Sequence, residues 1–248
     1  MDASVRVADI PASRGAAWIG EAFRLFGAAP VAWIAMCSGW AMISFALVFV
    51  PVIGVPLATF LQPPFFASFA IAAYRQLHGE RVGPGDLFLG FRRNLRALVN
   101  LGAVLLLANL AIFAVMVALG LPLALRGQQE ITIIEYAEQV RQNIWIIGVG
   151  FALTLLVKGA VWFAPQLIAF HGMETMQAMR WSAYAAVSNL GALLLYGLIL
   201  FLMLWASFLP APWLFGLAIV LPVMAISTYL GYRDVFEAVP VPGEIKAP

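Results

Sequence analysis

Long apolar runs separated by short polar connections dominate the sequence. Runs of roughly 20 residues are long enough to cross a ~30 Å hydrocarbon core as helices that rise 1.5 Å per residue. The pattern therefore predicts an all-α fold, a polytopic membrane helix bundle with six transmembrane helices. We expect the spans at about residues 28–50, 52–74, 97–123, 144–170, 185–208 and 213–232.

Three polar stretches that precede pairs of spans have the pattern of helices lying on the membrane surface. In residues 13–26, Trp18, Ile19 and Ala22 fall on one arc at 100° per residue, with Glu21 and Arg24 opposite. In residues 87–96 the apolar side chains again share one face and the arginines lie elsewhere. We interpret these stretches as interfacial amphipathic helices.

An internal repeat connects these surface helices to the spans. NLGAV at 100–104 recurs as NLGAL at 189–193, each time after an amphipathic, arginine-bearing stretch. In two returning spans, Pro64 and Pro222 stand ten residues before Tyr74 and Tyr232, and Pro165 is the corresponding proline of the middle span. The repeat predicts three hairpin units, each a surface helix followed by two spans.

The repeat also divides the chain. The hairpin units occupy about residues 13–81, 86–175 and 176–237 of a single six-span domain, which covers 13–237. The middle unit is longer because it contains an outer polar segment, 126–143. A short cytoplasmic tail at 1–12 precedes the domain, and a Pro-rich tail at 238–248, predicted to be disordered and cytoplasmic, follows it.

Basic residues orient the bundle. If the amino terminus is inside, the inner segments hold eleven basic residues and the outer segments only Arg126 and Arg141. This asymmetry predicts that both termini are cytoplasmic. The inner set is Arg6, Arg14, Arg24, Arg75, Arg81, Arg92, Arg93, Arg96, Arg180, Arg233 and Lys246.

Composition agrees with a membrane protein and narrows its chemistry. Hydrophobic residues make up 63% of the 248 positions and charged residues 10%, against about 25% charged in soluble domains. A net charge of +2 is too small to favour a nucleic-acid partner. The chain has no P-loop, GxSxG, HExxH or Rossmann fingerprint, so we expect no cofactor and no catalytic residues. Cys37, the single cysteine, lies within the first span.

Three short motifs carry a family resemblance: GEAFRLFGAAP at 20–30, GFRRN at 90–94 and WFAP at 162–165. With the tandem hairpins, they make the chain resemble an uncharacterised family of proteobacterial six-span inner-membrane proteins. It is more distantly similar to the membrane-domain family fused to glycerophosphodiester phosphodiesterases. The resemblance implies a bacterial inner-membrane location and a six-helix fold. It brings no catalytic residue.

Lys158 is the only formally charged side chain within the long apolar runs. A charge at the centre of the bilayer costs at least ~2.5 kcal/mol, so it marks a candidate intramembrane polar site. The candidate amides for the same site are Gln62, Asn109 and Gln166. In the register of the repeat, Lys158 instead corresponds to Leu57, only ~9 Å from the outer boundary, where a lysine can snorkel. The sequence leaves both interpretations open and favours snorkelling.

Two further groups are candidates for binding. Anionic lipid headgroups are expected to contact an arginine cluster on the inner side: Arg75, Arg81, Arg92, Arg93 and Arg96. A soft-metal site is an alternative to simple interfacial packing for four side chains: His171, Met173, Met176 and Met179. Topology alone would also place arginines on the inner side, and the sequence favours this simpler explanation.

The leading functional hypothesis is a non-enzymatic inner-membrane protein that scaffolds, assembles or regulates other membrane components. The spans show no clustered polar residues in sequence, which motivates it. The alternative is a small transporter or permease-like subunit with a cavity near Lys158, because broken helices and internal repeats often build transport sites. A membrane-embedded enzyme is a third hypothesis, for which convergent acid, base or metal groups are missing from the sequence pattern.

Overall fold

A computed structural model describes residues 6–121, 133–208 and 213–236, and within these ranges the fold is all-α. Six helical segments are long and apolar enough to cross a membrane. The elements are α1 (Arg14–Ala28), α2 (Pro30–Val48), α3 (Gly54–Leu77), the 3₁₀ helix η1 (Pro84–Arg92), α4 (Leu95–Ala118), α5 (Ile133–Gln142), α6 (Ile144–Val161), α7 (Ala164–His171), α8 (Thr175–Ser188), α9 (Leu190–Ser207) and α10 (Trp213–Val235).

The predicted spans coincide with α2, α3, α4, the α6–α7 pair, α9 and α10. The fourth span is divided into two helices at residues 162–163, just before Pro165. Of the outer polar segment 126–143, the first part lies outside the described residues, and the second part forms α5. The carboxyl-terminal tail, 238–248, also lies outside them.

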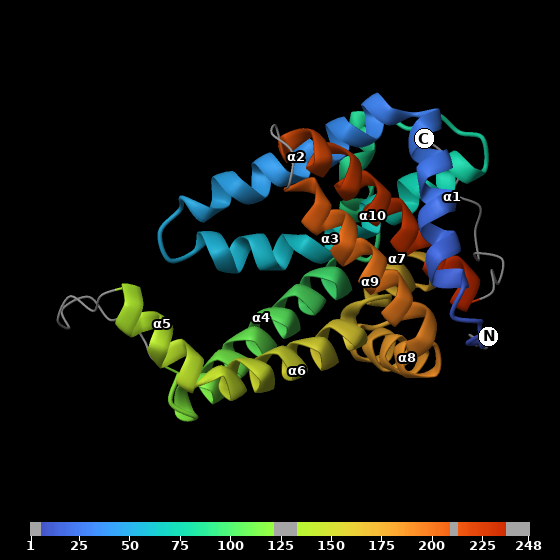
Figure 1. The fold of residues 1–248 in the computed structure, drawn as a ribbon. Helices are drawn as coiled ribbons and strands as arrows, with labels where there is room; N and C mark the ends of the chain where they lie inside the picture. Colours follow the sequence, from blue (N-terminus) through green and yellow to red (C-terminus); the bar gives the residue numbers. More distant parts are fainter. Residues whose placement is uncertain (1–5, 122–132, 209–212, 237–248) are drawn as a thin grey trace.

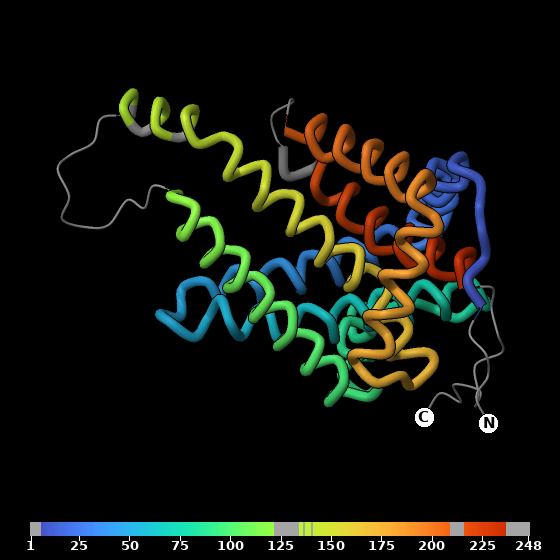
Figure 2. Tube along the Cα trace, turned by 90° about the horizontal axis from the view of Figure 1, so that it is seen from below, coloured from blue at the N-terminus to red at the C-terminus, as the bar shows by residue number. Residues whose placement is uncertain are grey.

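The spans form hairpins that share a common base and diverge from it. Figure 1 shows α2–α3 and α4–α6 extending away from the base in different directions, with α1, α7 and α8 gathered at the base. The view from below shows α9 and α10 side by side as a third hairpin (Figure 2). The first described residues lie at this base too, because Ala8 N donates to the carbonyl of Val235 at 2.7 Å.

The short helices α1, η1 and α8 each precede one hairpin in the chain but pack mainly on a different one. η1 lies against α2 and α3, and α8 lies against α6 and α7. α1, at the start of the chain, packs mainly on α9 and α10, the last hairpin. The three units therefore interlock in a closed cycle, in which the first short helix covers the third hairpin.

The returning helices form the centre of the bundle. In α3 and α10, 50% and 56% of the most apolar stretch of the helix is buried, against 11–17% in the other four spans. At the base, aromatic rings from all three hairpins meet: Tyr74 of α3, Phe170 of α7 and Tyr229 of α10 lie with ring centroids 5.6–6.3 Å apart. The core is thus concentrated at the base and along α3 and α10.

Prolines inside the returning helices are accommodated by neighbouring chain. Pro63 and Pro64 lie within α3 and cannot donate to the carbonyls of Thr59 and Phe60, four residues earlier. Gly102 of α4 covers these carbonyls so closely that an added Cβ would lie 2.8 Å from the Phe60 oxygen and 3.0 Å from the Thr59 oxygen. The glycine therefore lets α4 approach α3 closely at the break, as small residues do in the packing of membrane helices.

Candidate functional site

A cavity of about 330 Å³ lies where the three hairpins converge, and both Lys158 and two of its predicted partners line it. Its walls come from α2, α3, α4, α6, α7 and α10. Most of the lining is aromatic or aliphatic, with a few polar groups, which is the usual composition of a small-molecule site. The lining residues are Trp40, Gln62, Pro63, Phe66, Phe69, Leu105, Lys158, Val161, Trp162, Pro165, Gln166, Met224, Ala225 and Thr228.

Gln166 is the most constrained polar group of this cavity. Its side chain is 2% exposed, and its Oε1 atom has no hydrogen-bond partner. A buried amide oxygen without a partner costs about 1–3 kcal/mol, so such groups are normally paired. Gln166 lines the cavity, but its Oε1 atom is fully buried, so a donor on a ligand reaches that oxygen only when the amide turns toward the cavity.

The break between α6 and α7 adds a second feature that suits an anion. α7 begins at Ala164, and its first-turn residues Pro165 and Gln166 line the cavity. The amino-terminal end of a helix carries a partial positive charge from its aligned peptide dipoles. Lys158, in the last turn of α6, adds a full positive charge on the other side of the break. The site therefore has a positive potential with two amides, Gln62 and Gln166, for orientation.

Lys158 lies well within the fourth span. α6 runs without interruption from Ile144, so Lys158 lies fourteen residues, or ~21 Å, from the end of α6 that adjoins α5. The register of the repeat put Lys158 ~9 Å from the outer membrane boundary, and its depth in the bilayer stays a prediction. The residue is exposed and lines the cavity.

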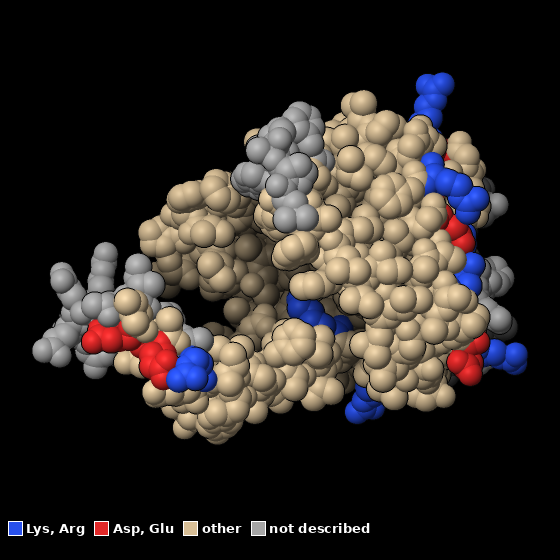
Figure 3. Space-filling view, viewed as in Figure 1, with Lys and Arg blue, Asp and Glu red and all other residues tan. Residues whose placement is uncertain are grey.

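Figure 3 shows the charges in this setting. Acidic and basic side chains gather at the base and on α5, and the intervening surface is uncharged except for basic atoms within a hollow. The hollow lies between the α2–α3 hairpin and the α4–α6 pair (Figure 3). Asn109, the remaining predicted amide, is exposed on α4 and does not line the cavity.

The predicted lipid-contacting arginines fall into two groups. Arg75 is held by two carboxylates, with Nε 2.6 Å from Glu80 and Nη1 2.7 Å from Asp86, so its charge is already neutralised. Arg81, Arg92 and Arg96 are exposed and Arg93 is half-buried, all near η1 at the base. Of the five arginines predicted to contact lipid, these four have no ion-pair partner among the described residues, and their contact with headgroups stays a prediction.

The His171 and methionine group is spread over different environments. Met173 is buried, whereas Met176 is exposed on α8. Among the described residues, no three His, Cys, Asp or Glu side chains lie together so that they could hold a metal ion. The ring of His171 packs beside Tyr232, with centroids 6.2 Å apart. A thioether site stays an untested prediction.

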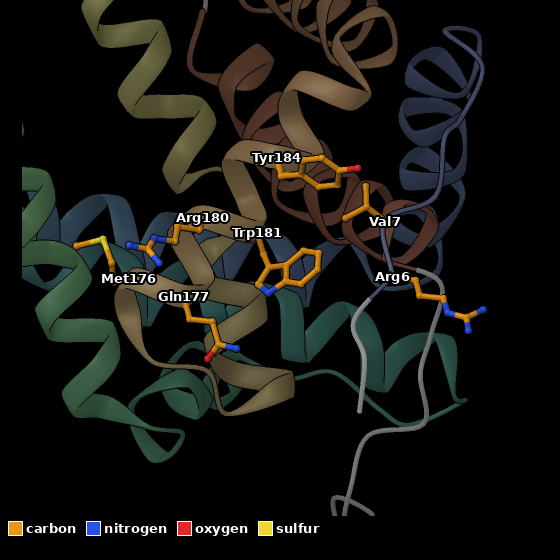
Figure 4. Close-up of a pocket in the computed structure, with 7 residues that line it drawn as sticks. All are labelled: Arg6, Val7, Met176, Gln177, Arg180, Trp181 and Tyr184. Atoms are coloured by element: carbon orange, nitrogen blue, oxygen red, sulfur yellow. The ribbon is translucent and has the colours of Figure 1, made fainter. Parts of the chain in front are cut away.

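A second, shallow groove of about 850 Å³ separates the amino-terminal segment from α8. Its two basic side chains, Arg6 and Arg180, point to opposite sides of the groove (Figure 4), so they do not converge on a shared anion. Trp181 and Tyr184 lie between them (Figure 4). The cavity at Lys158 is therefore the better binding site of the two.

Sequence reasoning missed a charged cluster that joins α1 to α10. Asp234 accepts hydrogen bonds from the guanidinium of Arg14 and, at 2.9 Å, from Nε1 of Trp18. Glu21 pairs with both Arg14 and Arg233 at 3.2 Å. The bonds to Asp234 raise the pKa of Arg14 above its ordinary value. These partners are more than 200 residues apart, so no local pattern in the sequence signals the cluster.

Six apolar helices with a charged base define a multi-pass membrane protein. The chain is similar to a probable inner membrane protein of Burkholderia thailandensis, with 28% identity over 240 residues that cover 91% of this chain and 84% of the relative. This likeness supports an inner-membrane location and an uncharacterised role. No protein-family model matches the chain, and no solved structure matches it significantly.

Proposed function

We propose that the protein binds an anionic group inside the inner membrane and acts as a small, non-enzymatic transporter or permease-like subunit. One observation carries this proposal: Lys158, Gln62 and Gln166 line a single cavity beside a helix break. Broken helices whose amino-terminal ends face an anion are a recurring way to build transport sites in membranes. An intramembrane lysine within such a cavity acts as the counter-charge.

The scaffold role expected from the sequence loses its main support, because polar side chains do cluster once the chain is folded. The scaffold role stays the second candidate, because many apolar residues of the fourth span are exposed. Only 11% of the most apolar stretch of that span is buried. Reproducible co-purification of another membrane protein in mild detergent would support a scaffold. The distant similarity to the glycerophosphodiester phosphodiesterase membrane domain stays a prediction.

Replacing Lys158 with methionine should abolish anion binding. Trp40 and Trp162 line the cavity, so methyl decyl phosphate, a phosphodiester with one negative charge, should change tryptophan fluorescence saturably when it is added to the protein in neutral detergent. Without the ammonium, the affinity should fall more than tenfold, because a desolvated charge pair contributes more than ~1.4 kcal/mol. Methionine keeps the length of the side chain and removes a charge from the membrane, so folding should not suffer.

Two variants make this test specific. Arg96→Met removes an exposed charge at the base and should bind methyl decyl phosphate like the wild type. Trp162→Phe should reduce the fluorescence change, which assigns the signal to the cavity. Unchanged affinity in Lys158→Met would rule out the proposed anion site.

We also propose that both termini are cytoplasmic, with α5 on the opposite side. In a Cys37→Ser background, Glu138→Cys on α5 should react with a membrane-impermeant maleimide added outside spheroplasts. Arg81→Cys, exposed between α3 and η1, should react only after the membrane is opened. The reverse labelling pattern would overturn this orientation.

A further inference from the structure

We infer that the ligand of the Lys158 cavity is a phospholipid headgroup with one negative charge and free hydroxyl groups, which enters sideways from the bilayer. This inference rests on the proposed function and adds the class of ligand. Three properties of the site lead to it: a single cation, an unpaired buried acceptor, and a hollow with apolar walls that leads to the cavity.

The charge of the site matches one anionic group. Lys158 is the only formal charge among the lining residues, and no carboxylate shares the cavity with it. A phosphodiester carries one negative charge and is balanced by one ammonium. A dianionic ligand would leave one charge unpaired in a largely apolar site, at a cost of several kcal/mol. A zwitterionic headgroup would bring a cation next to Lys158.

The unpaired acceptor calls for a donor on the ligand. Oε1 of Gln166 is buried and has no partner, and a phosphodiester oxygen cannot donate to it. A hydroxyl group attached near the phosphate can. A glycerol headgroup on a phosphodiester provides both the anion for Lys158 and the donor for Gln166.

The approach to the cavity suits acyl chains. On α6, Leu155 and Phe151 stand three and seven residues before Lys158, on the same helical face, and both are exposed. On α3, Val55 stands seven residues before Gln62 and is also exposed. The hollow between these hairpins has an uncharged surface around its basic atoms (Figure 3). Within a bilayer such walls contact lipid tails, whereas a water-soluble anion would need a polar path.

Four probes test the inference with the full-length protein in neutral detergent, with binding measured by native mass spectrometry. Phosphatidylglycerol supplies the charge and the hydroxyls, phosphatidylmethanol supplies only the charge, and phosphatidylcholine is the zwitterionic control. Glycerophosphoglycerol, the deacylated form of phosphatidylglycerol, is a phosphodiester with one negative charge and supplies the headgroup chemistry without tails. We expect phosphatidylglycerol to bind about tenfold tighter than phosphatidylmethanol, since one hydrogen bond to a buried acceptor separates them.

Variants assign each preference to its side chain. Gln166→Leu should equalise the two anionic lipids, because it removes the acceptor that distinguishes them. Lys158→Met should weaken both by more than tenfold and leave phosphatidylcholine unchanged. Asn109→Leu replaces an exposed amide of α4 that does not line the cavity, and it should bind all probes like the wild type.

The possible failures are distinguishable. If glycerophosphoglycerol competes as well as the lipid, the lipid inference is overturned and the proposed anion site stands. If phosphatidylglycerol and phosphatidylmethanol bind equally to the wild type, the hydroxyl part of the inference is wrong. If Lys158→Met binds every probe like the wild type, both the inference and the proposed function fail.

Discussion

Replacing Asp234 with alanine should lower the free energy of unfolding by about 3 kcal/mol. The carboxylate accepts hydrogen bonds from Arg14 and from the indole of Trp18, which is 1% exposed. Its removal leaves a buried indole N–H without a partner and places Arg14 and Arg233 together with only Glu21 to balance them. The unsatisfied indole N–H accounts for about 1–3 kcal/mol of this loss, and the half-buried ion pairs add less because solvent screens them.

Thermal unfolding in mild detergent, followed by circular dichroism, measures this effect. Asp234→Asn keeps an oxygen acceptor for Trp18 and loses the charge, so its midpoint should lie between those of the wild type and Asp234→Ala. Glu138→Ala breaks the exposed pair between Glu138 and Arg141 on α5 and should leave the midpoint unchanged. Equal midpoints for Asp234→Ala and Glu138→Ala would show that the cluster does not hold α1 on α10.

The spans were predictable because the physics that sets them is local. Twenty apolar residues in a row have few alternatives to a membrane helix, whatever the rest of the chain does. The ends were less predictable, because backbone geometry decides them. The third span was expected to reach residue 123, but α4 ends at Ala118, since Gly120 adopts φ +99° and Leu121 N bonds back to the Met116 carbonyl. In the fifth span, Asn189 separates α8 from α9.

The candidate site was predictable only in part. Lys158 was evident from the sequence, because no other charge interrupts an apolar run. Its place at a cavity was not, since helices that are distant in the chain form the walls of that cavity. The sequence gives no means to separate Gln62 and Gln166 from Asn109: all three are amides within spans, and only the packing of the helices determines which of them face the cavity.

The interlocking of the hairpins was the least predictable feature, because it joins residues that are distant in the chain. In two of the three contacts between a short helix and the hairpin that it covers, a glycine allows the closest approach. Gly15 of α1 meets the Ala192 carbonyl of α9, and Gly90 of η1 meets the Pro64 carbonyl of α3. In the third, Ser182 of α8 binds the backbone of the α6–α7 break, accepting from Phe163 N at 3.0 Å and donating to Gly159 O at 2.9 Å. A small residue at each contact therefore lets a short helix pack closely on a hairpin at the base.

Replacing Gly90 with valine should therefore destabilise the protein by about 3 kcal/mol or more. A Cβ at Gly90 would overlap the Pro64 carbonyl oxygen and lie 2.8 Å from Ser68 N, so η1 must move away from α3. That movement breaks the buried hydrogen bond from Gly90 N to Ser68 Oγ, 2.8 Å long, and adds to the cost of overpacking. Gly85→Val in the same helix is the matched control, because no atom lies within 4 Å of its added Cβ. Equal thermal midpoints for the two valine variants would contradict the role of Gly90 in seating η1 on α3.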